Sequence, residues 1–348
     1  MLIEEVMVLF DLDDYCKFKA SDISDFWRYG REIEFDEKKL INLNDYVYSA
    51  FLLGKEDLIS PEAVEKYIAY SSSAPYYGCK KKSHQLLPHT TAYSFGTLNI
   101  LDAMGYKATE KVFSSMEFDT SKIIRPKSGL PHWPAKWAHH TWRVSHWIGG
   151  GPAILLNILR NAKKKEFGEG YILDVLAECD RRIIDDKSGL LRAYKSESLQ
   201  SIFRFLYSFR HDPEVGNIGG LVHLHWVNYS MGRVFKSPQS LIDKCLRDTE
   251  KKPFLERYPY CLDFDYVQLL RVLSQQVKHR EDEVASRIEE YEKDVFSFFQ
   301  KPLPSQYSFH KLPGALAVLH EAALMRGSHE VLGIGIQPVD IIKKAYWL

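Results

Sequence analysis

Apolar residues recur at intervals of three and four positions along most of the chain. A clear example is the stripe formed by Tyr266, Leu269, Leu270, Leu273 and Val277, which would share one face of a helix. Patterns of this kind predict helices at 40–54, 60–70, 89–104, 137–148, 170–185, 197–209, 219–235, 237–249, 265–278, 281–299 and 313–325. The alternating pattern of strands is nearly absent, so the sequence predicts an all-α protein.

Several of these helices carry recognisable start signals. Ser60, Pro61 and Glu62 place a serine at the N-cap, a proline at the first helical position and an acid in the first turn. Ser237 and Pro238 repeat the same start. We therefore expect both serines to cap helices.

A long succession of helical hairpins without strands forms either a superhelical solenoid or a closed toroid. A solenoid needs a fixed repeat of about 34 or 40 residues, and the chain shows none. Unequal loops such as 71–88 and 119–136 favour an (α/α) toroid whose central cavity they would roof. The expected organisation is an N-terminal segment, 1–35, with a short helix at 22–31, followed by one all-α toroid domain, 36–348.

Composition and charge exclude several classes of partner. The 348 residues include 46 basic and 46 acidic side chains, so no overall field favours nucleic acid or an anionic membrane. No export signal is visible, and no apolar run approaches the ~20 residues of a membrane span. Five scattered cysteines show no metal-binding or disulfide spacing. A cytoplasmic protein with reduced cysteines is expected.

The segment 137–147 carries the densest chemistry in the chain. On a helix, His139, Trp142, Arg143 and His146 fall at offsets of three, four and seven and share one face. Such a stripe suits the wall of a sugar cleft, and it equally suits a solvated or interface helix. The glycines at 149–151 that follow indicate a helix break or a site of close packing.

The histidine spacings argue against a metal centre. His139 and His146 lie about 10.5 Å apart along a helix axis, which one ion cannot bridge. His223 and His225 would point roughly 200° apart around a helix. We therefore predict no metal and no cofactor. His225, Asn228 and Tyr229 do share a face, suited to sugar binding or proton transfer, although a buried histidine in the core is an equal reading.

Carboxylates form three further candidate groups. Asp185 and Asp186 lie in a predicted turn, where they would cap a helix. Asp263 and Asp265 open a helix, where they would either cap it or serve as a general acid in a cavity. Asp11, Asp13 and Asp14 match the Asp-x-Asp-Asp motif of class II terpenoid cyclases. A serine nucleophile motif and a phosphate-binding loop are both absent from the sequence.

Four runs within 85–326 resemble (α/α) toroid proteins that act on carbohydrates, such as unsaturated glucuronyl hydrolases and heparinase-type lyases. These runs are IIDDKSGLLRA, GGLVHLHWVNYSMGRV, YCLDFDYVQLLRVL and HKLPGALAVLHEAALM. In those families an Asp-x-x-Ser/Thr-Gly-Leu turn precedes an inner helix, as 185–190 would here. The resemblance implies a toroid fold and a saccharide substrate.

Together these observations predict a protein that binds, and acts on, a glycan or uronate-containing saccharide by His/Tyr or carboxylate acid–base chemistry. The alternatives are a terpenoid cyclase and a non-catalytic helical scaffold for a protein partner. The candidate catalytic residues are His139, His146, His225, Tyr229, Asp263 and Asp265. The candidate substrate-binding residues are Arg143, Trp142, Trp147, Trp226, His89 and Tyr93. We expect His139, Arg143 and His146 to face the same cavity as His225 and Tyr229.

Overall fold

The computed structural model describes residues 11–80, 85–134, 140–163, 165–192, 202, 205–206, 215–250, 253–331 and 335–348. Within these ranges the regular secondary structure is helical, and backbone pairing of the β type occurs only as isolated β-bridges. The predicted all-α fold is confirmed. The helix expected at 197–209 lies largely outside the described residues.

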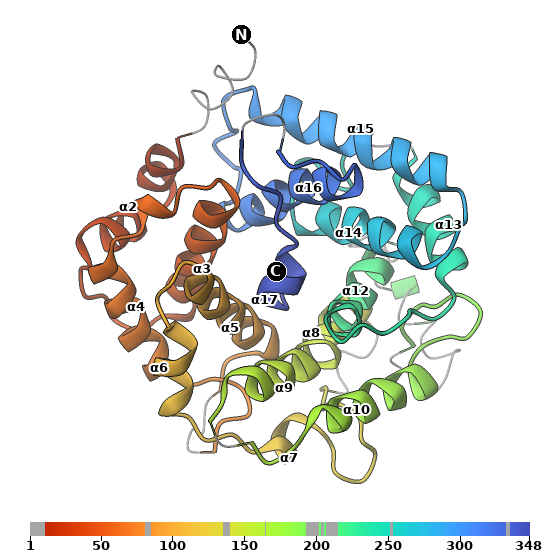
Figure 1. The fold of residues 1–348 in the computed structure, drawn as a ribbon, viewed down its shortest axis with the longest axis horizontal. Helices are drawn as coiled ribbons and strands as arrows, with labels where there is room; N and C mark the ends of the chain where they lie inside the picture. Colours follow the sequence, from red (N-terminus) through yellow and green to blue (C-terminus); the bar gives the residue numbers. More distant parts are fainter. Residues whose placement is uncertain are drawn as a thin grey trace.

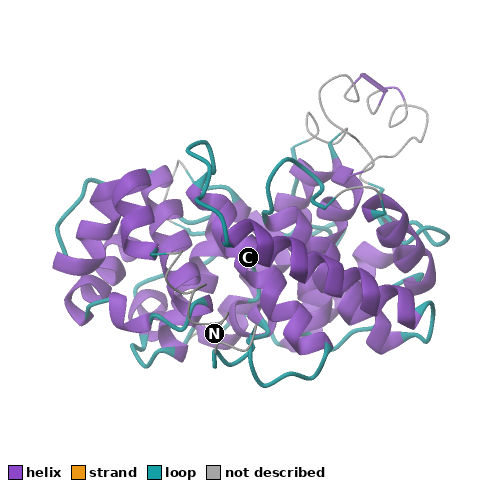
Figure 2. Cartoon of the chain, turned by 90° about the horizontal axis from the view of Figure 1, so that it is seen from above, coloured by secondary structure: helices purple, strands orange, loops and turns teal. Residues whose placement is uncertain are grey.

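Six helices of the described chain contact one another in a closed circle around the middle of the molecule (Figure 1). In order around this inner ring they are α3 (Glu37–Leu52), α5 (Pro88–Ala103), α9 (Gly150–Asn161), α12 (Val215–Ser230), α14 (Cys261–Gln276) and α16 (Leu312–Met325). Turned by 90°, the molecule is a flat disc, wider than it is thick (Figure 2).

Other helices pack outside this ring. They are α2 (Leu12–Tyr29), α4 (Pro61–Ser73), α6 (Ala108–Ser114), α7 (Thr120–Ile123), α10 (Glu169–Arg182), α13 (Pro238–Thr249) and α15 (Glu281–Phe299). For example, α15 contacts α14 and α16, and α10 contacts α9. Each outer helix buries one side against the ring. This explains why apolar residues recur every three or four positions in the sequence.

The start signals in the sequence predict the two Ser-Pro helices unequally well. Ser60 caps α4 by accepting a hydrogen bond from the Ala63 amide, as predicted. Ser237 also precedes its helix, but it adopts a left-handed conformation and its hydroxyl donates to the Asp186 carbonyl instead. The expectation that Ser237 caps α13 is therefore wrong, because a contact with a distant loop directs its side chain away from the helix.

The N-terminal segment contains more helix than the sequence suggests. Helix α2 begins at Leu12 and is kinked at Ala20, so the short helix expected at 22–31 is its second half. Asp11 caps the first half by accepting from the amides of Asp13 and Asp14. Residues 12–29 then pack on α3 and α4.

The C-terminal residues fill the middle of the inner ring. Helix α17 (Ile341–Ala345) contacts α5 and α12, and Figure 1 shows it at the centre of the circle. Trp347 is fully buried and Leu348 nearly so. No helix in the described ranges is long and apolar enough to cross a bilayer.

Candidate functional site

The chemically dense segment forms helix α8 (Thr141–Ile148), which packs against α12 and runs into α9. His140 caps α8 by accepting a hydrogen bond at Nδ1 from the Arg143 amide. His139 lies outside the described residues. Of the side chains in the predicted stripe, the structure therefore describes those of Trp142, Arg143 and His146.

The glycines after α8 serve close packing, as one reading of the sequence predicted. A Cβ atom on Gly149 would lie 2.5 Å from the backbone carbon of His223, and one on Gly150 would lie 3.0 Å from Pro88. The missing side chains let the junction of α8 and α9 touch both α5 and α12. This contact brings three histidines from different helices together.

The three histidines are His89 of α5, His146 of α8 and His223 of α12. The rings of His89 and His146 stack with centroids 4.5 Å apart, and His223 lies 5.6 Å from His89 and 5.7 Å from His146. Trp347 stacks on His223 at 4.7 Å. We call His89, His146, His223 and Trp347 the imidazole cluster.

Hydrogen bonds within the imidazole cluster assign the proton positions. Trp347 Nε1 donates to His89 Nδ1 at 3.0 Å, so a neutral His89 carries its proton on Nε2. Ser145 donates to the Trp142 carbonyl and lies 2.7 Å from His223 Nδ1, which makes His223 the donor in that pair. Burial, and then the neighbouring imidazoles, lower the pKa of His89 and of His223. Burial therefore keeps both rings in the neutral form.

A second polar group borders this cluster. Asp45 is fully buried on α3 and accepts hydrogen bonds from the Tyr93 hydroxyl at 2.7 Å and from His310 Nδ1 at 2.9 Å. The carboxylate of Asp45 raises the pKa of His310, whose side chain remains 49% exposed. Tyr93 also stacks on His89 with centroids 6.4 Å apart. We call Asp45, Tyr93 and His310 the acid–base group.

The two predicted carboxylates of α14 have different surroundings. Asp263 accepts from the Leu255 and Tyr260 amides, so it has the capping role that the sequence offered as one alternative. Asp265 is buried, and its Oδ1 has no hydrogen-bond partner among the described residues. Burial, with Asp263 nearby, raises the pKa of Asp265 well above its usual range. A Cβ atom on Gly219 would touch both Asp265 and Trp142, so these side chains are near neighbours.

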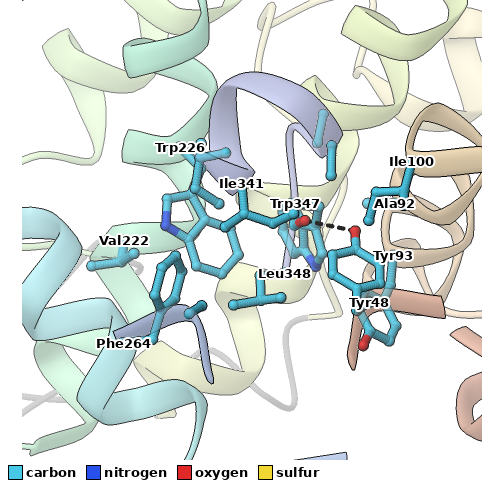
Figure 3. Packing of buried hydrophobic residues seen from close by; sticks show 14 of the residues in the cluster. Tyr48, Ala92, Tyr93, Ile100, Val222, Trp226, Phe264, Ile341, Trp347 and Leu348 are labelled. Atoms are coloured by element: carbon cyan, nitrogen blue, oxygen red, sulfur yellow. Dashed lines mark hydrogen bonds between the residues drawn. The ribbon is translucent and has the colours of Figure 1, made fainter. Parts of the chain in front are cut away.

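The predicted residues His225 and Tyr229 lie apart from the imidazole cluster. His225 stacks on Phe235 at 3.9 Å, and Tyr229 donates to Asp340 at 2.5 Å. His223 and His225 thus diverge, as the helical spacing requires. Trp226 is fully buried against Trp347 in the core (Figure 3), whereas Arg143 is exposed. The structure brings His146 together with His89 and Tyr93, and it does not bring His225 or Tyr229 to them.

An open pocket of about 650 Å³ lies beside the imidazole cluster. Its lining includes Tyr77, Gln85, Lys122, His132, Trp133 and Trp147. The pocket adjoins the cluster because the rings of Trp147 and His146 stack with centroids 6.4 Å apart. Trp147 was predicted to bind substrate, and the structure places it in this lining.

Two similar hairpins, which the sequence analysis missed, lie next to each other near this pocket. IIRPKSGL at 123–130 and IIDDKSGL at 183–190 differ only at their third and fourth residues. In both, a β-bridge closes the turn and the glycine has positive φ. Arg182 donates to the Ser128 carbonyl at 3.2 Å, so the hairpins adjoin. The first hairpin leads into His132 and Trp133. A search for internal repeats would have found this signal.

The acidic motif of 11–14 has a structural explanation. Asp11 caps α2, Asp13 pairs with Arg28, and Asp14 pairs with Lys17 at 3.0 Å. In the described ranges, no group of three or more His, Cys, Asp or Glu side chains is arranged to hold a metal ion. In comparisons with protein-family models, curated proteins and solved structures, the chain matches none.

Proposed function

We propose that the protein binds a saccharide beside its imidazole cluster and acts on it by general acid–base chemistry. The observation that supports this function best is the acid–base group, in which one buried carboxylate holds both a phenol and a half-exposed imidazole. A carboxylate in this position orients the imidazole and favours its protonated form. His310 would then exchange a proton with the substrate, and the buried Tyr93 would hold the Asp45 carboxylate in place through its hydroxyl.

The resemblance to carbohydrate-active toroids is consistent with this proposal. The closed circle of inner helices supports the toroid architecture that the resemblance implies. The rings of Tyr48 and His89 pack against Tyr93 of the acid–base group, and aromatic rings beside polar groups suit saccharide recognition. A hydrolase, lyase or epimerase acting on a uronate-containing saccharide is the corresponding reaction class.

Turnover of uronate-containing oligosaccharides, followed by reducing ends and by the absorbance of unsaturated uronates, tests the proposal. His310→Ala should lower kcat about 10²- to 10⁴-fold. A matched control is His279→Ala, because His279 pairs with Asp243 at 2.9 Å, outside the acid–base group. Asp45→Asn should move the His310 limb of the pH profile to lower pH, since Asp45 raises that pKa. Absence of turnover, or equal losses in both histidine variants, contradicts the proposal.

A further inference from the structure

The pocket beside the imidazole cluster has the composition of a ligand site. Three of its aromatic side chains come from separate segments: Tyr77 follows α4, Trp133 follows the first hairpin, and Trp147 lies near the end of α8. Each keeps part of its surface exposed. Rings presented in this way offer flat apolar faces with polar edges, which suit the face of a pyranose.

The Trp133 ring is held in place. The Arg125 guanidinium lies 4.3 Å from the ring centroid and donates to the Trp133 carbonyl at 3.2 Å. The stacking and the hydrogen bond both restrict the indole. A ring fixed before binding loses little conformational entropy when a ligand stacks on it.

The polar groups of the pocket are also preorganised. Gln85 bonds at both ends of its amide, donating to the Cys79 carbonyl at 2.8 Å and accepting from the Gly78 amide at 3.2 Å. His132 Nε2 lies 3.0 Å from the Ser121 carbonyl. These bonds fix the donors and acceptors without help from a ligand.

The charge of the described lining is positive. Lys122 donates to the carbonyls of Cys79 and Lys80 at 2.9 and 3.2 Å, which leaves the third donor of its ammonium group for a ligand. No Asp or Glu occurs among the described lining residues. The nearby Asp119 instead accepts from the Ser121 amide and hydroxyl. The lining therefore favours an anion over a neutral ligand.

The pocket borders the imidazole cluster at Trp147. Trp147 stacks on His146 at 6.4 Å, and His146 stacks on His89 at 4.5 Å. A ligand stacked on Trp147 would therefore lie next to His146.

We propose that the pocket is a subsite for a negatively charged pyranose unit of an oligosaccharide. The pyranose face stacks on Trp133 and Trp147, and its carboxylate accepts from Lys122. The statement that this unit belongs to an oligosaccharide rests on the proposed function. The pocket itself makes a separate prediction about binding.

Calorimetry and ligand-observed NMR with sodium glucuronate, and with glucose as the neutral probe, test the subsite. Glucuronate should bind at least about tenfold more tightly than glucose, and Trp133→Ala should weaken its binding at least about tenfold. Lys122→Met should remove the preference for glucuronate. Tyr29→Ala is the matched control, because Tyr29, the last residue of α2, also lies under an arginine: the Arg31 guanidinium is 5.4 Å from its ring centroid. Trp133→Phe, which keeps a ring, should bind glucuronate better than Trp133→Ala.

The outcomes separate this inference from the proposed function. Saturable glucuronate binding that depends on Trp133 and survives His310→Ala supports the subsite, even if no oligosaccharide is turned over. Turnover that depends on His310, without saturable glucuronate binding, overturns the subsite alone. Equal affinity for glucose and glucuronate, or unchanged binding in folded Trp133→Ala protein, also overturns it.

Discussion

The indole Nε1 of Trp347 donates a 3.0 Å hydrogen bond to Nδ1 of His89, across 258 positions of sequence. The backbone carbonyl of Trp347 accepts a second hydrogen bond, from the Tyr48 hydroxyl at 2.7 Å (Figure 3). The C-terminal residues therefore pack at the centre of the ring of inner helices. The hydrogen bond from Trp347 also sets the tautomer of His89 in the imidazole cluster.

Replacing Trp347 tests how far the centre of the ring depends on this contact. Trp347→Ala removes a fully buried indole and should lower the free energy of unfolding by about 3–5 kcal/mol. Denaturant unfolding measures the change. Val234→Ala is the control, because Val234 is 72% exposed and should change stability by less than about 0.5 kcal/mol. Equal effects in the two variants would show that Trp347 does not support the core.

The close approach at Gly149 makes a second prediction. Gly149→Ala places a Cβ atom 2.5 Å from the His223 backbone, which cannot move aside cheaply, so it should destabilise the fold by about 1–3 kcal/mol. Gly149 has an ordinary φ of −87°, so the cost comes from packing. Gly170→Ala, in α10 with no atom within 4 Å of the new Cβ, should instead stabilise the protein by about 0.5–1 kcal/mol. Thermal unfolding of both variants compares the two effects.

A buried ion pair between two inner helices makes a third prediction. Arg271 of α14 pairs with Glu321 of α16, and it also reaches Asp340 at 3.0 Å. Arg271→Met leaves the buried Glu321 carboxylate without its cation and should cost about 3–5 kcal/mol. Adding Glu321→Gln removes that charge and should recover part of the loss. A double-mutant cycle in urea measures the coupling, and strictly additive effects would contradict it.

The buried His320 makes the stability depend on pH. Its Nε2 donates to the Leu52 carbonyl at 2.7 Å and its Nδ1 accepts from the Val339 amide at 3.1 Å, so the folded protein holds it neutral. Burial lowers the pKa of His320 to about 4, against about 6.5 in the unfolded chain. Between these values the unfolded state binds the additional proton, so stability falls as pH falls from about 6.5 to about 4, by up to about 3 kcal/mol.

A His320→Gln variant checks this pH dependence. Glutamine offers both a donor and an acceptor but takes up no proton in this range. The variant should lose less stability than the wild type when the pH of denaturant unfolding is lowered through the same window. Parallel curves for the two proteins would show that His320 does not contribute to the acid sensitivity.

Local patterns in the sequence predict the helices well, because helix formation depends on residues within about four positions. The expected helix at 281–299 has the observed bounds of α15, and the Ser60 cap is confirmed. Ser237 fails as a cap because its hydroxyl bonds to Asp186, 51 positions away. That contact depends on how the hairpin at 183–190 lies against α13, which no local pattern contains.

The sequence by itself determined an all-α chain, the positions of most helices and the unusual chemistry of the α8 segment. The tertiary structure decided which side chains meet. Asp45 and His310 are 265 positions apart, and their contact exists because α16 closes the circle against α3. His225 and Tyr229 share a helix with His223 but face other neighbours. Side-chain spacing along one helix sets its faces, whereas the order and packing of several helices set which faces form a site.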